Sequence, residues 1–194
     1  MKTKSILLYI LSILLLSSCS LIFGDLFEEE DRTKLPPLTQ RGKNTFGCMV
    51  GDSLFLKSNE RNFIQSPRLY FYDAGDSAIV IWCYDNDGQN IRLFIPKDEV
   101  VIGSYFTVKT DVLEYGDDYI KYSFFSSKGG VYGNDNRKNY MYFAKEVEMI
   151  FHRFDEKVSA GEFSMELYGA TYPDSLLSIT EGRFDLRNID IKLD

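Results

Sequence analysis

The sequence predicts an all-β fold, an antiparallel β-sandwich or flattened barrel in a single domain, preceded by a signal peptide and a flexible tether. Apolar residues alternate with polar ones at a period of two, and clusters of Gly, Asn and Asp recur at short intervals between the alternating stretches. No stretch has the period of a long amphipathic helix. Residues 43–194, about 150 in number, are enough for one domain with a sizeable core and roughly ten to twelve strands.

Residues 1–18 have the layout of a signal peptide. Lys2 and Lys4 form a short basic region, an apolar stretch follows, and small residues precede Cys19. The apolar stretch covers about 12 residues, whereas a helix needs roughly 20 to cross a bilayer. A permanent transmembrane helix is therefore the weaker alternative.

Leu16-Ser17-Ser18-Cys19 resembles the bacterial lipobox, in which an apolar residue and two small ones precede an acylated cysteine. The resemblance implies cleavage after Ser18 and a diacylglyceryl thioether on Cys19, as in a palmitate-bearing lipoprotein of the outer membrane, on its periplasmic or its surface side. Each buried methylene contributes about 0.8 kcal/mol, so several acyl chains on Cys19 make a durable membrane anchor. An ordinary signal peptide with a cysteine near its cleavage site is the alternative.

Residues 19–42 are predicted to be a flexible tether. They contain a run of acids between Asp25 and Asp31, then Pro36-Pro37, and they show no regular period. The acidic run is either a solvated linker or a sorting signal for display on the cell surface.

The net charge argues against a nucleic-acid partner. The formal charge is −7 for the whole chain. Loss of Lys2 and Lys4 with the signal peptide makes it about −9, and an acidic chain repels a phosphate backbone.

The domain begins with a predicted hairpin, in which residues 46–50 and 53–56 flank the two-residue turn Gly51-Asp52. Residues 78–84 are apolar on both faces and rich in β-branched side chains, which predicts a central strand covered on both sides. Residues 96–100 begin with proline and predict one helical turn.

Residues 162–167 and 188–193 alternate strictly and predict strands with one buried and one wet face. The apolar phase changes after Leu186, which predicts a bulge or turn near Arg187-Asn188. Further turns are predicted at residues 74–76, 85–88, 116–118, 129–130 and 133–136.

Cys48 and Cys83 remain once Cys19 is assigned to lipid. An even number of cysteines in an oxidising compartment permits a disulfide between them. Two buried free thiols are the alternative, because spacing along the chain does not supply the geometry of a bond.

Three stretches, at the two ends of the domain, resemble a family of small, uncharacterised lipoproteins of Bacteroidota-type bacteria. Residues 34–55, KLPPLTQRGKNTFGCMVGDSLF, resemble its opening signature, and residues 159–167 and 179–187, SAGEFSMEL and ITEGRFDLR, resemble its closing pair of strands. The chain departs from the pattern at Arg41, Lys43 and Ala160. The family has no established activity, so the resemblance implies only structural roles. It places Asn44, Thr45 and Gly47 at the entry to the first strand, and Gly182 and Asp185 in the last hairpin.

The sequence indicates a non-enzyme, with no catalytic, metal or cofactor residues assigned. His152 is the single histidine and shares a predicted strand face with Ile150 and Phe154, which favours a packed or half-exposed side chain over a general base. Residues 85–88 start like a calcium loop, but the twelfth position is Pro96 in place of the required Glu, so a polar turn is favoured. With 29 acids in the chain, a pair of carboxylates alone does not indicate a glycosidase.

The aromatic content, 15% of the chain, is the remaining functional hint. Tyr132, Tyr140 and Tyr142 lie in or beside a stretch rich in Gly, Asn and Asp and form a candidate contact surface for an unknown protein or glycan. Cross-strand aromatic packing is the favoured alternative for most of the tyrosines. The expected function is therefore a lipid-anchored envelope protein with a non-catalytic binding or interaction domain. A structural component of an envelope complex is the alternative, and a hydrolase is a weaker one.

Overall fold

The computed structural model describes residues 33–58, 72–73, 78–109, 123–127, 141–172 and 174–188. All of them belong to one compact unit, Arg32–Asp194. Cys19, Tyr132, Tyr140 and the predicted strand at residues 189–193 lie outside the described residues, as do the predicted turns at residues 74–76, 116–118, 129–130 and 133–136.

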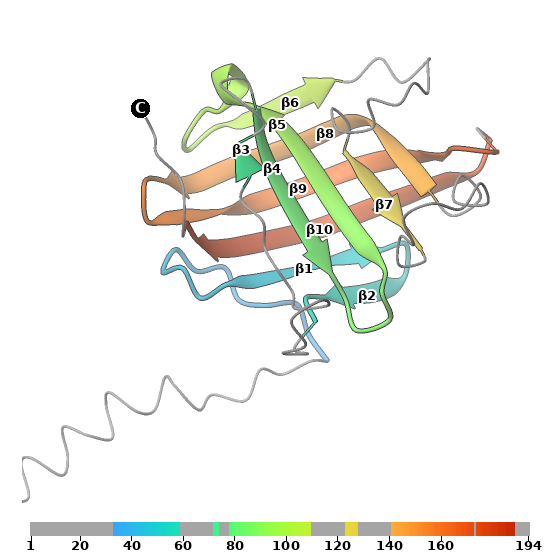
Figure 1. The fold of residues 1–194 in the computed structure, drawn as a ribbon, viewed down its shortest axis with the longest axis horizontal. Coiled ribbons are helices and arrows are strands. Elements are labelled where there is room, and N and C mark those ends of the chain that lie inside the picture. The colour runs from blue at the N-terminus through green and yellow to red at the C-terminus, as the bar shows by residue number, and fades with distance from the viewer. Residues whose placement is uncertain are drawn as a thin grey trace, which may run out of the picture. The chain divides into compact units, whose positions relative to one another are not determined.

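The described strands form one antiparallel sheet of ten strands, as predicted for the fold class (Figure 1). Their order across the sheet is β2-β1-β10-β9-β8-β7-β5-β4-β3, and β6 pairs with β8 beside this path. The strands are β1 (Thr45–Val50), β2 (Ser53–Leu56), β3 (Tyr72–Asp73), β4 (Ala78–Tyr84), β5 (Asn90–Pro96), β6 (Tyr105–Lys109), β7 (Phe124–Ser126), β8 (Met141–Phe154), β9 (Val158–Gly169) and β10 (Leu176–Arg187).

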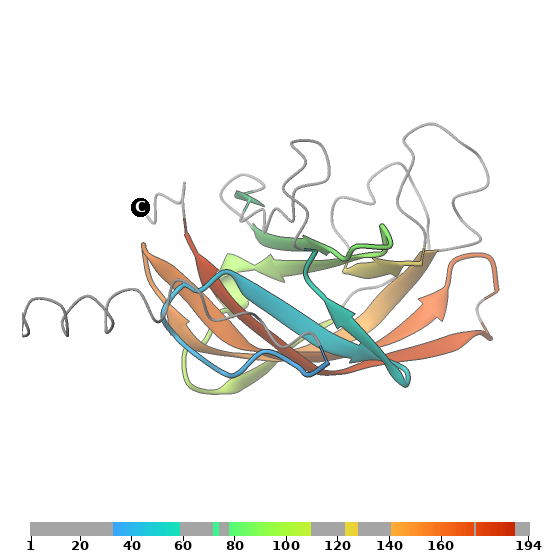
Figure 2. The same ribbon diagram turned by 90° about the horizontal axis from the view of Figure 1, so that it is seen from below.

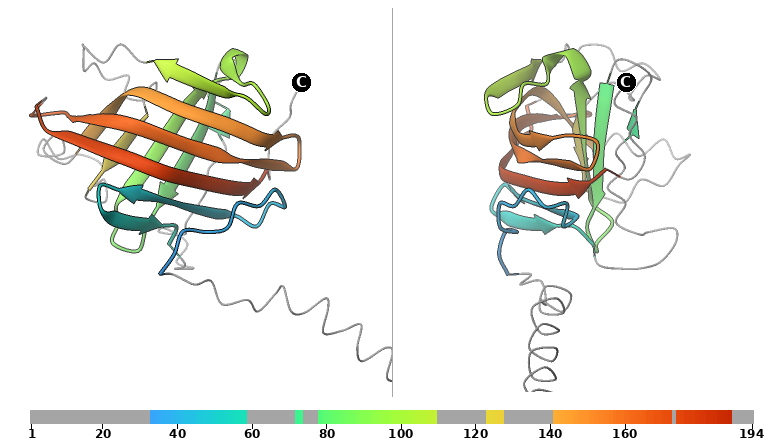
Figure 3. Two further views of the ribbon diagram at one scale, coloured as in Figure 1. Left: turned by 180° about the vertical axis from the view of Figure 1, so that it is seen from behind. Right: turned by 90° about the vertical axis from the view of Figure 1, so that its left-hand side faces the viewer.

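The sheet curls because β8 belongs to two layers. Its first residues, 141–143, pair with β7, and residues 146–150 pair with β6, with a register shift between Ala144 and Glu146. A bulge of this kind bends the strand and increases its twist. Figure 2 accordingly shows β4, β5 and β7 stacked over the long strands β8, β9 and β10, and Figure 3 shows the same two layers from behind and from the side. The result is the predicted flattened barrel or sandwich.

The core lies between the two layers. In β9 the side chains of Phe163, Met165 and Leu167 are buried and that of Glu166 is exposed, which confirms the predicted alternation. Phe151 of β8 and Phe184 of β10 meet edge to face, with ring centroids 5.3 Å apart. Strand β4 is largely buried on both faces, as its uninterrupted apolar sequence predicts.

The described turns follow the sequence predictions. Gly51-Asp52 joins β1 to β2, and Gly51 has a φ of +55°, which glycine adopts without strain. Residues 97–99 form one 3-10 turn, η2 (Lys97–Glu99), directly after Pro96. Strand β10 ends at Arg187, where a bulge or turn was expected, and its register shift lies earlier, beside Glu181, whose φ is +52°.

Within the described residues, no helix is both long and apolar enough to cross a membrane.

Candidate functional site

Tyr142 lies on the inner side of the fold. It is half-buried, packs against the core, and its ring centroid is 6.2 Å from that of Phe125, its register partner on β7. This position favours the cross-strand packing that was the alternative for the tyrosines, since a packed ring has little surface left for a partner.

Asp185 of β10 holds the segment that was expected to be the end of the tether. Its carboxylate is 1% exposed and accepts hydrogen bonds from the hydroxyl of Thr39 and from the backbone N–H groups of Arg41 (3.2 Å), Gly42 (2.7 Å) and Lys43 (3.3 Å). We call this set of contacts the Asp185 clamp. The folded unit therefore starts about ten residues before the expected boundary at Lys43.

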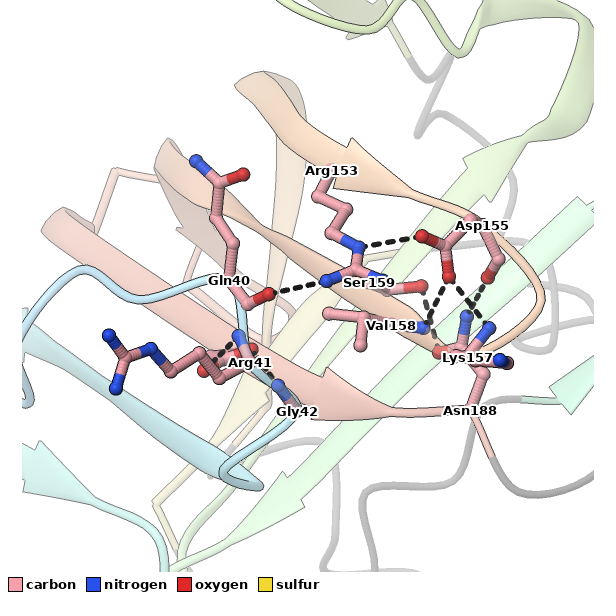
Figure 4. A network of polar contacts seen from close by, with 10 residues as sticks. Gln40, Arg41, Gly42, Arg153, Asp155, Lys157, Val158, Ser159 and Asn188 are labelled. Atoms are coloured by element: carbon pink, nitrogen blue, oxygen red, sulfur yellow. Dashed lines mark hydrogen bonds and ion pairs between the residues drawn. The ribbon is translucent and has the colours of Figure 1, made fainter.

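Arg153 of β8 makes a second attachment to the same segment (Figure 4). One of its terminal nitrogens donates to the backbone carbonyl of Gln40 (2.8 Å), and its Nε donates to Asp155 Oδ2 (2.6 Å). The other Asp155 oxygen accepts the N–H groups of Lys157 (2.7 Å) and Val158 (2.9 Å) in the turn between β8 and β9. The hydrogen bond from Arg153, with those from the backbone, lowers the pKa of Asp155 to about 2.

The C-terminal end of β10 joins this network. Ser159 donates its hydroxyl to Asn188 Oδ1 (2.9 Å), and the Asn188 amide donates to the Asp155 carbonyl. The N–H of Arg187 donates to Asn44 Oδ1 (2.7 Å). Asn44 has a φ of +56°, a conformation that asparagine tolerates better than most residues, so the turn into β1 and the end of β10 are fixed together.

Close packing explains two of the glycines in the resembling segments. A Cβ on Gly47 would lie 2.6 Å from Cδ of the buried Pro36, and a Cβ on Gly182 would lie 2.5 Å from the Phe163 ring. Because β1 and β10 are paired, the opening and closing segments lie side by side. The residues singled out by the resemblance thus have structural contacts, although Asp185 acts on residues 39–43 and not within the last hairpin.

His152 bridges two strands on the polar face. It lies at a register shift of β8, is half-buried, and its Nε2 is 2.6 Å from Glu162 Oε1 on β9. The half-exposed strand histidine predicted from the sequence is confirmed. Phe154 packs against the core, so His152 and Phe154 do not share one uninterrupted strand face. Among the residues that the structure describes, no group of three His, Cys, Asp or Glu side chains is placed to hold a metal ion.

The 85–88 turn is built around Asp85. Its Oδ1 accepts the N–H groups of Asp87 (2.9 Å) and Gln89 (2.8 Å), and Gly88 has a φ of +79°. These contacts make the polar turn that the sequence favours over a calcium loop. Burial raises the pKa of Asp85 above its ordinary value, against the opposing effect of the backbone hydrogen bonds.

An arginine lies between aromatic rings on the face of β4, β5 and β7 that points away from the core. Arg92 is 5% exposed, and its Cζ lies 5.9 Å from the ring centroid of Trp82 and 6.0 Å from that of Phe124, its neighbours in register. Trp82 stacks on Tyr84 at 5.3 Å and donates its Nε1–H to Asn90 (3.2 Å). The sequence analysis did not predict this arginine–aromatic cluster. The position of Arg92 between the inward-facing Ile91 and Leu93 could have indicated it, because it places Arg92 on the outer face of β5.

An exposed apolar patch borders β6. Val101, Ile102 and Tyr105 are 48%, 56% and 63% exposed. Ile102 bridges to Phe151 of β8, and the Gly103 N–H donates to the Phe151 carbonyl (2.8 Å), which holds this segment against the sheet. We call these three side chains the β6 patch; a contiguous exposed apolar patch is a candidate contact surface.

Cys48 and Cys83 are both buried as free thiols.

No family model, curated protein or solved structure matches this chain.

Proposed function

We propose that this protein is a lipid-anchored component of the cell envelope whose β domain binds a partner without catalysing a reaction. The anchoring half of the proposal rests on Leu16-Ser17-Ser18-Cys19, which stands at the end of a basic and then apolar N-terminus. The acyl chains on Cys19 would be the only membrane element needed, because several chains on one residue hold a protein durably. We place the anchor in the outer membrane.

The Asp185 clamp supports a short distance between lipid and fold. It fixes residues 39–43 to β10, and the described structure begins at Thr33. A chain of the length of residues 20–32 spans at most about 45 Å when fully extended. That reach is close to the diameter of a domain of this size, about 40 Å, so the partner is expected at the envelope itself.

The β6 patch supports the binding half of the proposal. Its three apolar side chains are about half exposed or more and adjoin one another along a short segment.

The anchor is tested by labelling cells that express the full chain with an alkyne analogue of palmitate. The native chain is expected to carry label and to sediment with membranes, while Cys19→Ala loses both. Cys48→Ala is the matched control, because it removes a thiol from the core and is expected to keep the label. An unlabelled native chain, or label retained by Cys19→Ala, overturns the anchoring half.

The binding half is tested with Ile102→Ser and Tyr105→Ser, which remove apolar surface without emptying the core. Both variants are expected to fold with native stability and to lose at least tenfold in affinity for the envelope component that co-purifies with the native chain. Leu176→Ser, at an equally exposed leucine (69%) outside the patch, is the control. Equal loss of binding in all three variants contradicts the assignment of the patch.

A structural role in an envelope complex is the second candidate, because the patch adjoins β6, which pairs with β8 alone among the described strands. An edge strand offers backbone groups to a partner chain. A photo-crosslinking amino acid at position 105 distinguishes the two: one protein adduct of fixed size favours assembly, whereas glycan binding by the purified full chain favours a carbohydrate ligand.

A further inference from the structure

Strand β6 lies at the margin of the layer of long strands. Figure 3 shows it at one edge of this layer, with β1 and β2 at the other edge. Of the part of the sheet that the structure describes, only β8 pairs with β6, along residues 105–109. An antiparallel strand with one partner carries backbone N–H and C=O groups along its second side, and these groups can pair with a further strand. The sheet can therefore be extended at β6.

The side chains of β6 alternate between the two faces of the sheet. Val108 belongs to the core and Phe106 packs against it, so both point inward. Tyr105, Thr107 and Lys109 are exposed on the outer face. Thr107 is the middle residue of the strand, so a symmetric pairing of two β6 strands that uses all five residues is centred on it.

Two copies of β6 are complementary when they run antiparallel about Thr107. A two-fold axis perpendicular to the sheet relates such strands, so outer residues oppose outer residues and inner residues oppose inner ones. Tyr105 of each copy then lies opposite Lys109 of the other, which sets a cation beside an aromatic ring. On the inner side Phe106 lies opposite Val108, and the two Thr107 hydroxyls meet on the axis. This register brings no like charges together.

The lysine of this edge does not block a neighbouring strand. Lysine on an edge strand commonly prevents pairing, because a charge loses water when another chain covers it. Here Lys109 Nζ lies 4.0 Å from Glu146 Oε2 on β8, so the side chain leans back over its own sheet. A tyrosine ring placed opposite Lys109 contacts the apolar stem, while the ammonium group stays beside Glu146 and in water.

We propose that β6 is a dimerisation edge, at which two copies of this chain join their sheets through antiparallel β6 strands centred on Thr107. The inference names the partner of the β6 patch, to which Tyr105 belongs, and so rests on the binding half of the proposed function. Each β6 edge is occupied by the other, so the contact closes and gives a dimer and not a filament.

The attachment of the N-terminal segment is compatible with two copies on one membrane. Gly47 lies between the core residues Phe46 and Cys48, so its own position faces outward. The Pro36 ring covers this position, since a Cβ on Gly47 would lie 2.6 Å from Pro36 Cδ. A two-fold axis perpendicular to the sheet turns the outer faces of both copies to the same side, so both tethers join the dimer on one side.

A shared membrane also compensates for the small size of the contact. Each copy contributes a strand of five residues, which is less than a stable dimer in dilute solution needs. Two chains anchored in one membrane have a much higher effective concentration than two free chains, so pairing is expected on the membrane.

The pairing is tested with Thr107→Cys in the full chain, on native membranes treated with a mild oxidant. The Cα atoms of directly opposite residues are about 5 Å apart, so the introduced thiols are expected to join two copies by a disulfide. Thr180→Cys, at an exposed threonine of β10, is the matched control and is expected to remain monomeric. A Thr107→Cys chain that reacts with a maleimide reagent but forms no more dimer than Thr180→Cys overturns the proposal.

The register is tested by exchanging the two residues that oppose each other. In the Thr107→Cys chain, Tyr105→Lys sets two ammonium groups opposite each other twice in every dimer, and is expected to slow cross-linking by about tenfold. Adding Lys109→Tyr again places a lysine opposite a tyrosine, so the rate is expected to return to within about threefold of its original value. A rate that stays as low as with Tyr105→Lys alone overturns the proposal.

Failure of this pairing and failure of the proposed function give different results. If β6 pairs with another envelope protein, Tyr105→Ser loses its co-purifying component while Thr107→Cys forms no dimer, and only the pairing of copies is overturned. If Cys19 carries no lipid but Thr107→Cys forms the dimer, only the anchoring half of the proposed function is overturned.

Discussion

Asp185→Ala is expected to detach residues 39–43 from β10. The native carboxylate is 1% exposed and accepts three backbone N–H groups and one hydroxyl. Hydrogen bonds to a charged group contribute about 1.5–3 kcal/mol each and are not additive, and the buried N–H groups lose their partner. We therefore expect Asp185→Ala to lower the free energy of unfolding by about 3–5 kcal/mol, measured in urea.

Trypsin reports the local part of this loss, because Arg41 and Lys43 lie within the clamped segment. A segment destabilised by about 3 kcal/mol opens roughly a hundredfold more often, so cleavage at these two sites is expected to accelerate by about that factor. Asp185→Asn tests the charge, since one of its two polar atoms becomes an amide that faces N–H donors. We expect Asp185→Asn to lose most of the free energy of unfolding that Asp185→Ala loses.

Asp174→Ala, at an exposed aspartate in the turn before β10, is the control and is expected to change stability by less than about 0.5 kcal/mol. The clamp does not stabilise this segment if Asp185→Ala has a free energy of unfolding within about 0.5 kcal/mol of the native value and is cleaved at the native rate. A native-like Asp185→Asn beside a damaged Asp185→Ala would show that one acceptor oxygen is enough and that the charge adds little.

Three further changes have defined outcomes. Gly182→Ala is expected to lower the free energy of unfolding by about 2–4 kcal/mol, measured in urea, because its Cβ would lie 2.5 Å from both the ring and the backbone carbonyl oxygen of Phe163; a loss below about 1 kcal/mol would mean that the ring and the backbone of β9 both shift at little cost. Arg153 lowers the pKa of Asp155 to about 2, so the stability that the Asp155 carboxylate contributes is present above pH 4 and is lost as the pH falls to 2. The melting temperatures of Asp155→Asn and of the native protein should therefore converge between pH 4 and pH 2, and a constant difference contradicts the assignment. Arg92→Met is expected to cost about 1–2 kcal/mol through loss of two cation–π contacts and to alter the emission of the chain's single tryptophan, whereas an unchanged spectrum speaks against the stacked arrangement.

The Asp185 clamp helps to hold the opening and closing resembling segments against each other. Residues 34–55 and 179–187 are far apart in the chain, yet they meet as the paired strands β1 and β10. Asn44 accepts a hydrogen bond from Arg187, and Asp185 holds the residues just before Asn44. Substitution in either segment is therefore expected to loosen the other, because side-chain oxygens of one segment accept hydrogen bonds from backbone N–H groups of the other.

The sequence alone determined the strand faces and several turns. Alternation at Phe163, Met165 and Leu167 predicts which side chains are buried in β9, since successive side chains of a strand point to opposite faces. Gly51-Asp52 and residues 96–100 predict their turns because those conformations depend on the residues themselves.

Only the tertiary structure decided what meets across the fold. Thr39 and Asp185 are 146 positions apart, and the donors that Asp185 holds are mostly backbone N–H groups, which nearly every residue carries. No sequence pattern marks such a partner, so residues 33–42 looked like tether. The inward position of Tyr142 and the meeting of β2 with β4 beside Cys83 likewise depend on how the sheet curls, because period-two alternation assigns a face to a residue but does not say which strand will cover it.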